Sequence, residues 1–204
     1  MKWVRDLYDW VLHWADTPYG PAALFILSFA EASFFPIPPD VLLIALALGS
    51  RARAFNFATL CMIASITGAM LGYGIGHFVW WTGAGEFSSV ATFFFANIPG
   101  FTHELFYQIQ GLYEEWNFWI IFTAGFTPIP YKVFTISAGA FDVNFIMFLI
   151  ASLVSRSARF FLVAGLIWKF GDPIRDFIDK RFNLVAIAFT VLLVGGFVAI
   201  KYLF

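Results

Sequence analysis

The sequence predicts an all-α integral membrane protein with inverted repeats, each combining a re-entrant helical hairpin with a transmembrane helix. First, hydrophobic residues make up 61% and charged residues 12% of the 204 residues, whereas soluble domains carry about a quarter charged residues. Second, a Pro-x-Pro motif occurs twice, each time inside a long apolar stretch. Third, Lys and Arg are unevenly distributed along the chain. The mean hydropathy of +0.81 agrees with this class, and the length predicts a single membrane domain, residues 1–204.

Residues 1–17 are predicted to form an amphipathic helix that lies in the membrane interface. Its apolar positions follow a helical period and fall on one face: Trp3, Leu7, Trp10, Val11 and Trp14. Tryptophan side chains suit the headgroup region. The alternative is a helix that packs on the protein itself.

The first repeat is predicted over residues 20–82. Its first part, 21–49, is apolar but is interrupted between Pro36 and Asp40. Proline removes a backbone donor and clashes with the preceding turn, so the helix must break there. The following stretch, 57–81, is long enough to cross a bilayer.

Residues 83–115 form a mixed connecting segment without Lys or Arg. The second repeat is predicted over 116–170 and begins with the second interrupted stretch, 116–141, followed by an apolar stretch of spanning length, 147–168. A charged loop then leads to a last transmembrane helix at 183–204.

The charge pattern favours two re-entrant hairpins over two full spans. If both stretches are hairpins, the basic residues that flank the membrane segments fall almost entirely on one side of the membrane. They are Lys2, Arg5, Arg51, Arg53, Lys169, Arg175, Lys180 and Arg181. Only Lys201 then falls on the other side. Full spans would separate Arg51 and Arg53 from the N-terminal charges. The positive-inside rule therefore predicts a multi-pass protein of the cell inner (plasma) membrane with a cytoplasmic N-terminus.

The two Pro-x-Pro motifs are predicted to form the hairpin tips, with Pro36 and Pro38 in one repeat and Pro128 and Pro130 in the other. Further matches follow in order, such as Trp81 with Trp168. With the topology above, the hairpins enter from opposite sides. Paired breaks in inverted repeats are typical of transporters.

Five charges within the apolar layer are the candidate substrate- or proton-binding residues: Glu31, Asp40, Lys132, Arg156 and Arg159. Each would cost several kcal/mol if it faced lipid, so all should face an interior or a water-filled cavity. Asp40 and Lys132 hold equivalent places after the two tips. We expect these acidic and basic tips to approach each other, and a buried ion pair that only holds the tips together is the alternative.

Arg156 and Arg159 lie on one helical face with Ser152 and Ser155 nearby. Two guanidinium groups with hydroxyls suit a phosphate. Alternatively they pair with Glu31 and Asp40, and the two arrangements can alternate. A carboxyl group in a low-dielectric site favours its neutral form, which allows proton coupling at Glu31.

Gly68, Gly72 and Gly76 step by four and predict close helix packing or a sliding surface. No catalytic motif is present in the sequence, and we expect no enzyme activity. Cys61 is the only cysteine, and no histidine has a partner at metal-ligand spacing. We expect no cofactor and no metal, and the net charge of −1 argues against nucleic acid.

These residues carry a resemblance to the DedA superfamily, the group with the VTT (SNARE-associated) domain, and to its YqaA-like branch. The matching motifs are Glu31-x4-Pro36-x-Pro38-x-Asp40, the glycines of 68–76, and 126–132 leading to 137–140. The resemblance covers about residues 20–170. It implies inverted re-entrant hairpins and lipid movement, as flippase or scramblase of phosphatidylethanolamine or undecaprenyl phosphate, in some members linked to the proton-motive force. Many members have an arginine before the second motif, where this chain has Phe126.

The leading hypothesis is a membrane transporter that flips or scrambles a phosphate-bearing lipid between leaflets, with membrane lipids as partners and protons as a further candidate partner. The five intramembrane charges would bind the phosphate and the protons. One alternative is a proton-coupled secondary transporter of a small ion or oxyanion. Another is a non-transporting membrane assembly factor. The lipid headgroup and the existence of a homo-oligomer are left open.

Overall fold

The computed structural model describes residues 13–14, 17–34, 38–83, 85–97, 102–127, 130–171 and 173. Statements below concern these residues. The predicted last transmembrane helix, nearly all of the predicted interfacial helix, and the tip residues Pro36 and Pro128 lie outside them.

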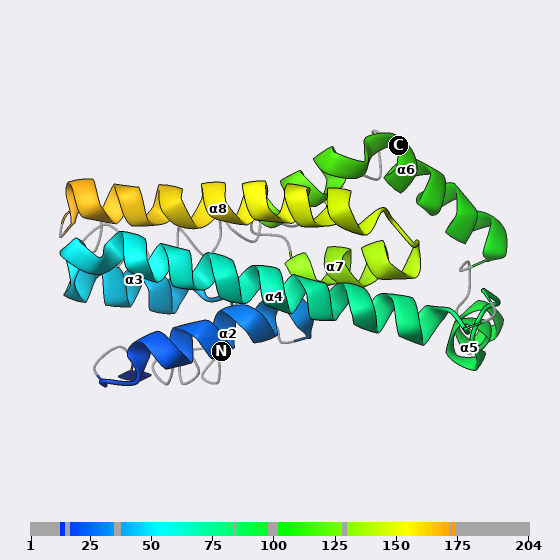
Figure 1. Cartoon of the computed structure of the whole chain (residues 1–204), viewed down its shortest axis with the longest axis horizontal. Coiled ribbons are helices and arrows are strands. Elements are labelled where there is room, and N and C mark those ends of the chain that lie inside the picture. Colours follow the sequence, from blue (N-terminus) through cyan, green and yellow to red (C-terminus); the bar gives the residue numbers. More distant parts are fainter. Residues whose placement is uncertain are drawn as a thin grey trace.

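The described chain is helical, which confirms the all-α prediction (Figure 1). Its elements are α2 (Gly20–Ser33), α3 (Asp40–Gly49), the 3-10 turn η1 (Arg51–Arg53), α4 (Ala54–Trp80), α5 (Ser89–Asn97), α6 (His103–Phe126), α7 (Tyr131–Ala140) and α8 (Phe145–Phe170).

Two helices are long and apolar enough to cross a membrane, as the sequence predicts. They are Arg51–Trp80, with 30 residues, and Phe145–Phe170, with 26 residues. A helix of this length extends about 40 Å, whereas the hydrocarbon core of a bilayer is about 30 Å thick. Each begins a few residues before the predicted apolar stretch. For α8 the reason is the side chain of Asn144, which accepts a hydrogen bond from the Met147 amide and caps the helix start.

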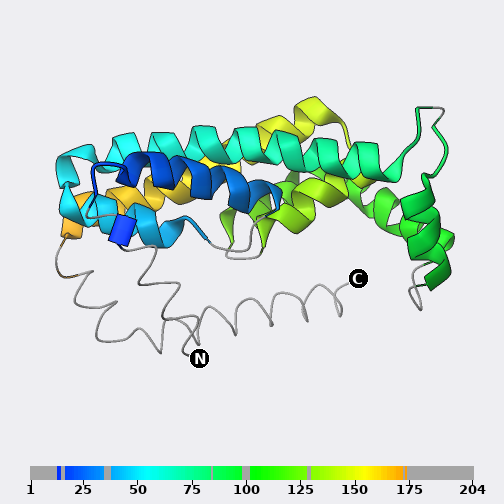
Figure 2. The same ribbon diagram turned by 90° about the horizontal axis from the view of Figure 1, so that it is seen from below.

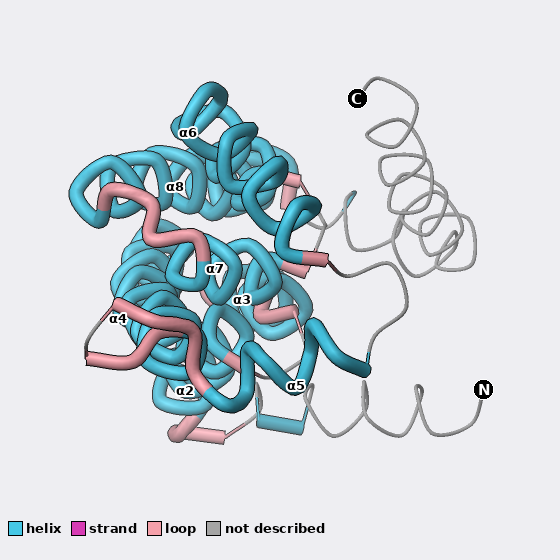
Figure 3. The backbone as a smooth tube through the Cα atoms, turned by 90° about the vertical axis from the view of Figure 1, so that its right-hand side faces the viewer, coloured by secondary structure: helices cyan, strands magenta, loops and turns pink. Residues whose placement is uncertain are grey.

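Shorter helices cover the two halves of α4. Figure 1 shows α3 beside one half of α4 and α7 beside the other half. Seen along the bundle, α3 and α7 lie between α8 and α2 (Figure 3). Helix α5 crosses the far end of the bundle, where α4 ends, and α6 leads back from there (Figure 2).

The helices α3 and α7 both start directly after a proline, Pro39 for α3 and Pro130 for α7. A missing amide donor costs nothing at a helix start.

The glycines of α4 allow α2 and α7 to approach its backbone. A Cβ atom at Gly68 would overlap the carbonyl of Phe29 in α2, and one at Gly76 would overlap the carbonyl of Ile136 in α7. Between them, a Cβ atom at Gly72 would overlap the Thr135 hydroxyl of α7 and lie 3.1 Å from the Ala32 carbonyl of α2. Helix α4 therefore contacts both α2 and α7 around Gly72.

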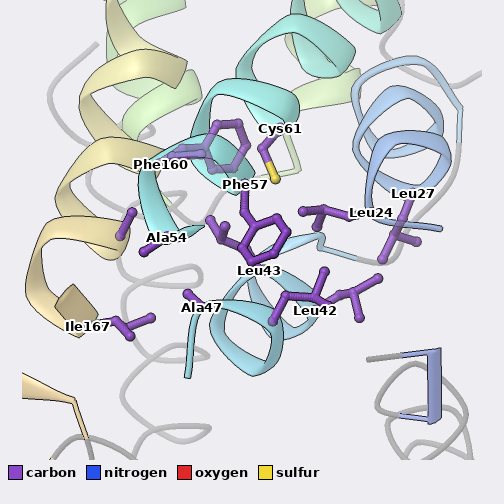
Figure 4. Packing of buried hydrophobic residues seen from close by; sticks show 13 residues of the cluster. Leu24, Leu27, Leu42, Leu43, Ala47, Ala54, Phe57, Cys61, Phe160 and Ile167 are labelled. Carbon is purple, nitrogen blue, oxygen red and sulfur yellow. The ribbon is translucent and has the colours of Figure 1, made fainter. Parts of the chain in front are cut away.

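An apolar cluster joins α2, α3, α4 and α8 at one end of the bundle (Figure 4). Leu24, Leu43, Phe57 and Phe160 are buried there, and Cys61 lies among them. A second cluster joins α4, α6, α7 and α8 toward the other end. The two clusters hold α8 against the rest of the bundle, and Arg156 and Arg159 of α8 lie between them in sequence.

Candidate functional site

Four of the five candidate charges form two ion pairs between α8 and the first interrupted segment. The Arg156 guanidinium donates to a Glu31 carboxylate oxygen at 2.6 Å. The Arg159 guanidinium donates to both Asp40 oxygens, at 3.0 and 2.8 Å. Glu31 lies near the end of α2 and Asp40 begins α3. The pairs therefore connect α8 to the helices on both sides of the first proline motif, α2 and α3, which is the carboxylate pairing that the sequence allows.

The Arg156 side chain is enclosed on all sides by protein. Its Nε donates to the Ser65 hydroxyl at 2.7 Å, and its guanidinium lies over the Tyr131 ring at 4.8 Å and the Phe160 ring at 4.7 Å. The side-chain exposure is only 2% for Arg156 and 11% for Glu31. A cation that is both hydrogen-bonded and packed between aromatic faces is well compensated for its loss of water.

The Arg159 side chain is more accessible. Its side-chain exposure is 14%, and that of Asp40 is 18%. Besides Asp40 it donates to the backbone carbonyl of Thr127, the residue that directly follows α6. Arg159 therefore connects the start of α3 with the end of α6, where both interrupted segments break. A planar guanidinium with two parallel hydrogen bonds is also the geometry that binds phosphate.

Lys132 does not take the place that the sequence predicts for it. It is the second residue of α7 and is half-buried. It forms no ion pair with another described residue, and Asp40 pairs with Arg159 instead. One contact between the two segments is made by Thr135, whose hydroxyl donates to the Ala32 carbonyl at 2.9 Å. The equivalent residues Asp40 and Lys132 therefore do not form an ion pair, and Arg159 of α8 supplies the cation that neutralises Asp40.

Sequence reasoning missed several residues of the site. It placed Ser152 and Ser155 beside the arginines, but Ser152 accepts from Tyr131 at 2.5 Å and Ser155 donates to the Ser152 carbonyl at 3.1 Å. The hydroxyl that binds Arg156 is Ser65, on α4. A usable signal was present, since Ser65 lies on the small-residue face that continues with Gly68 and Gly72. The Thr127 carbonyl and the two aromatic faces have no such signal.

Comparison with known proteins finds relatives over nearly the whole chain. An uncharacterized protein of Haemophilus influenzae is 35% identical over 204 residues, covering 98% of this chain and 100% of the relative. An uncharacterized protein of Histophilus somni is 36% identical and covers 95% of this chain and 99% of the relative. An uncharacterized protein of Methanocaldococcus jannaschii is 27% identical over 69% of this chain and 79% of its own length. No family model and no solved structure matches the chain.

Proposed function

The chain belongs to the family of the uncharacterized Haemophilus influenzae and Histophilus somni proteins, and we propose that it translocates a phosphate-bearing lipid between the two leaflets of a membrane. It is a transporter and not an enzyme in this proposal. The resemblance to the DedA superfamily points to the same activity. The support from this chain itself is the arrangement around Arg159.

In the proposed topology, α2 with α3 and the end of α6 with α7 are re-entrant hairpins of two inverted repeats. The hairpins enter from opposite sides, α4 and α8 span the inner membrane, and the N-terminus is cytoplasmic. The arrangement in Figure 1, with α3 and α7 beside opposite halves of α4, supports this topology. Inverted repeats with broken helices place a substrate site near the midplane of the bilayer.

The observation that carries the proposal is the contrast between the two arginines. The Arg156 side chain is 2% exposed and donates to Glu31 and Ser65, whereas the Arg159 side chain is 14% exposed and binds Asp40 through two parallel hydrogen bonds. A phosphate group offers the same two-oxygen face as a carboxylate. We infer that the lipid phosphate displaces Asp40 from Arg159, while the Arg156–Glu31 pair stays closed. Lys132, free of an ion pair among the described residues, is available as a second cation for the phosphate.

Displacement of Asp40 supplies a route to proton coupling. A carboxylate that loses its cation in a low-dielectric site favours its neutral form. Asp40 therefore takes up a proton when the phosphate arrives and releases it when the pair with Arg159 forms again. Lipid movement that is indifferent to an imposed proton gradient would contradict this coupling.

Reconstituted vesicles test the proposed substrate class. We expect the purified protein to accelerate leaflet exchange of a fluorescent phosphatidylethanolamine, and to leave a fluorescent glucosylceramide, which lacks a phosphate, at the rate of protein-free vesicles. Dithionite quenching of the outer leaflet measures both rates. Soluble phosphate or sulfate flux without lipid exchange would instead identify an oxyanion transporter. Absence of both activities in vesicles that contain folded protein would favour an assembly factor.

A further inference from the structure

A row of stacked aromatic rings runs along α6 toward the candidate site. Phe118, Phe122 and Phe126 are four residues apart, so they follow one another on one side of the helix. Their rings are nearly parallel, with centroids 5.8 Å and 16° apart for the first pair and 5.9 Å and 5° for the second. Trp119 places its ring edge against Phe118 at 5.5 Å and Phe122 at 5.9 Å. We call these four side chains the aromatic ladder.

The Phe126 end of the aromatic ladder is one residue away from a backbone contact of Arg159. Phe126 is the last residue of α6, and the next residue, Thr127, accepts the Arg159 hydrogen bond through its carbonyl. One turn earlier along α8, Ser155 lies against Gly125, where a Cβ atom would overlap its hydroxyl. The apolar row thus leads to a cation that is partly accessible. This combination is complementary to an amphiphile with an anionic head and an apolar chain.

The aromatic ladder differs from the exposed apolar face of α8. Trp119 is 60% and Phe126 is 40% exposed. On α8 the large exposed apolar side chains before Trp168 are unbranched or branched aliphatic ones: Ile146, Met147, Ile150, Leu153, Val154, Leu162 and Leu166. Exposed side chains without stacked rings, such as those of α8, are sufficient for contact with bulk lipid. Rigid rings lose little conformational entropy when they hold a ligand.

The length of the aromatic ladder indicates which chain it fits. From Phe118 to Phe126 the helix rises about 12 Å, and the hydrocarbon of one leaflet is about 15 Å deep, half of the bilayer core. One acyl chain in a leaflet matches this distance, whereas a long polyprenyl chain greatly exceeds it.

We propose that the aromatic ladder binds one acyl chain of a glycerophospholipid whose phosphate reaches Arg159. This rests on the proposed function, because it assumes that Arg159 receives a lipid phosphate. It adds the chain-binding subsite and the lipid class. The ladder orients the lipid along α6, so that its headgroup arrives at the position where Asp40 is displaced.

Photolabelling tests the subsite in reconstituted vesicles. The probe is a phosphatidylethanolamine with a diazirine on its acyl chain, and mass spectrometry locates the labelled peptides. We expect α6 peptides with the ladder to be labelled more strongly than α4 peptides around Phe78, which is 81% exposed and so reports contact with bulk lipid. Phe122→Ala should reduce the α6 label roughly three- to tenfold, the loss expected for one aromatic contact. The matched control, Phe78→Ala, should leave it unchanged.

Three results would overturn the proposal. They are equal labelling of α6 and α4, an α6 label insensitive to Phe122→Ala, or an α6 label that arises from a polyprenyl phosphate diazirine probe but not from the glycerophospholipid probe. Labelling is measured without transport. A protein that labels at the ladder but moves no lipid would contradict the proposed function and leave the acyl-chain subsite standing.

Discussion

Replacing Glu31 with leucine should lower the free energy of unfolding by about 3–5 kcal/mol, because it leaves a buried guanidinium without its counter-charge. The Arg156 side chain is 2% exposed and donates to Glu31 at 2.6 Å. Its remaining contacts, the Ser65 hydroxyl and the two rings, carry no formal charge. Equilibrium unfolding of the purified protein in detergent micelles measures the loss.

A double variant distinguishes a charge effect from a packing effect. Glu31→Leu combined with Arg156→Met removes both charges and keeps similar volumes, and should recover most of the lost stability, as replacement of buried ion pairs by apolar residues often does. A double variant as unstable as Glu31→Leu alone would show that the pair acts through packing. A single variant with unchanged stability would contradict the enclosed ion pair altogether.

Replacing Arg159 with alanine should slow phospholipid exchange in vesicles about thirtyfold or more, since loss of one partner of a buried charge pair costs 2–5 kcal/mol. Arg159→Lys keeps the charge but cannot form two parallel hydrogen bonds, so it should be intermediate. The matched control is Arg53→Ala. Arg53 is an exposed arginine of η1 whose guanidinium lies over Phe57, away from the site. We expect its exchange rate to equal that of the wild type.

The Arg159 variants also separate binding from folding. Arg159→Ala, Arg159→Lys and the control Arg53→Ala should all elute as the same species and show helical circular dichroism before the assay. If folded Arg159→Ala exchanged lipid at the wild-type rate, Arg159 could not be the phosphate-binding residue. If Arg53→Ala lost as much activity as Arg159→Ala, the effect would be one of general positive charge.

Composition and periodicity were sufficient to predict the helical class and the two helices of spanning length. Apolar length is a local property, so it can be read directly from residues such as those of 57–81. The placement of Arg156 and Arg159 on one face of a helix is local for the same reason. The family relationship adds no activity, because the relatives themselves are uncharacterized.

The partners of these arginines could not be predicted uniquely, because they depend on how separate helices are placed. Asp40 was expected near Lys132 from the equivalence of the two tips, but the packing of α3 on α8 brings Arg159 to it. Arg156 reaches across to α4, where Ser65 supplies the hydroxyl. Sequence spacing predicts neighbours within one helix. It does not give the register between helices that are far apart in the chain.

Headgroup binding tests the central claim most directly, that a lipid phosphate displaces Asp40 from Arg159. A short-chain phosphatidic acid can be titrated into the protein in detergent, with its 31P resonance reporting binding. The two variants Asp40→Asn and Arg159→Ala should then change the affinity in opposite directions. Asp40→Asn removes the internal competitor and should tighten binding about tenfold, since a larger fraction of the protein is competent to bind, whereas Arg159→Ala should abolish it. Equal weakening by both variants, or no change with either, would show that the Asp40–Arg159 pair only holds the helices together.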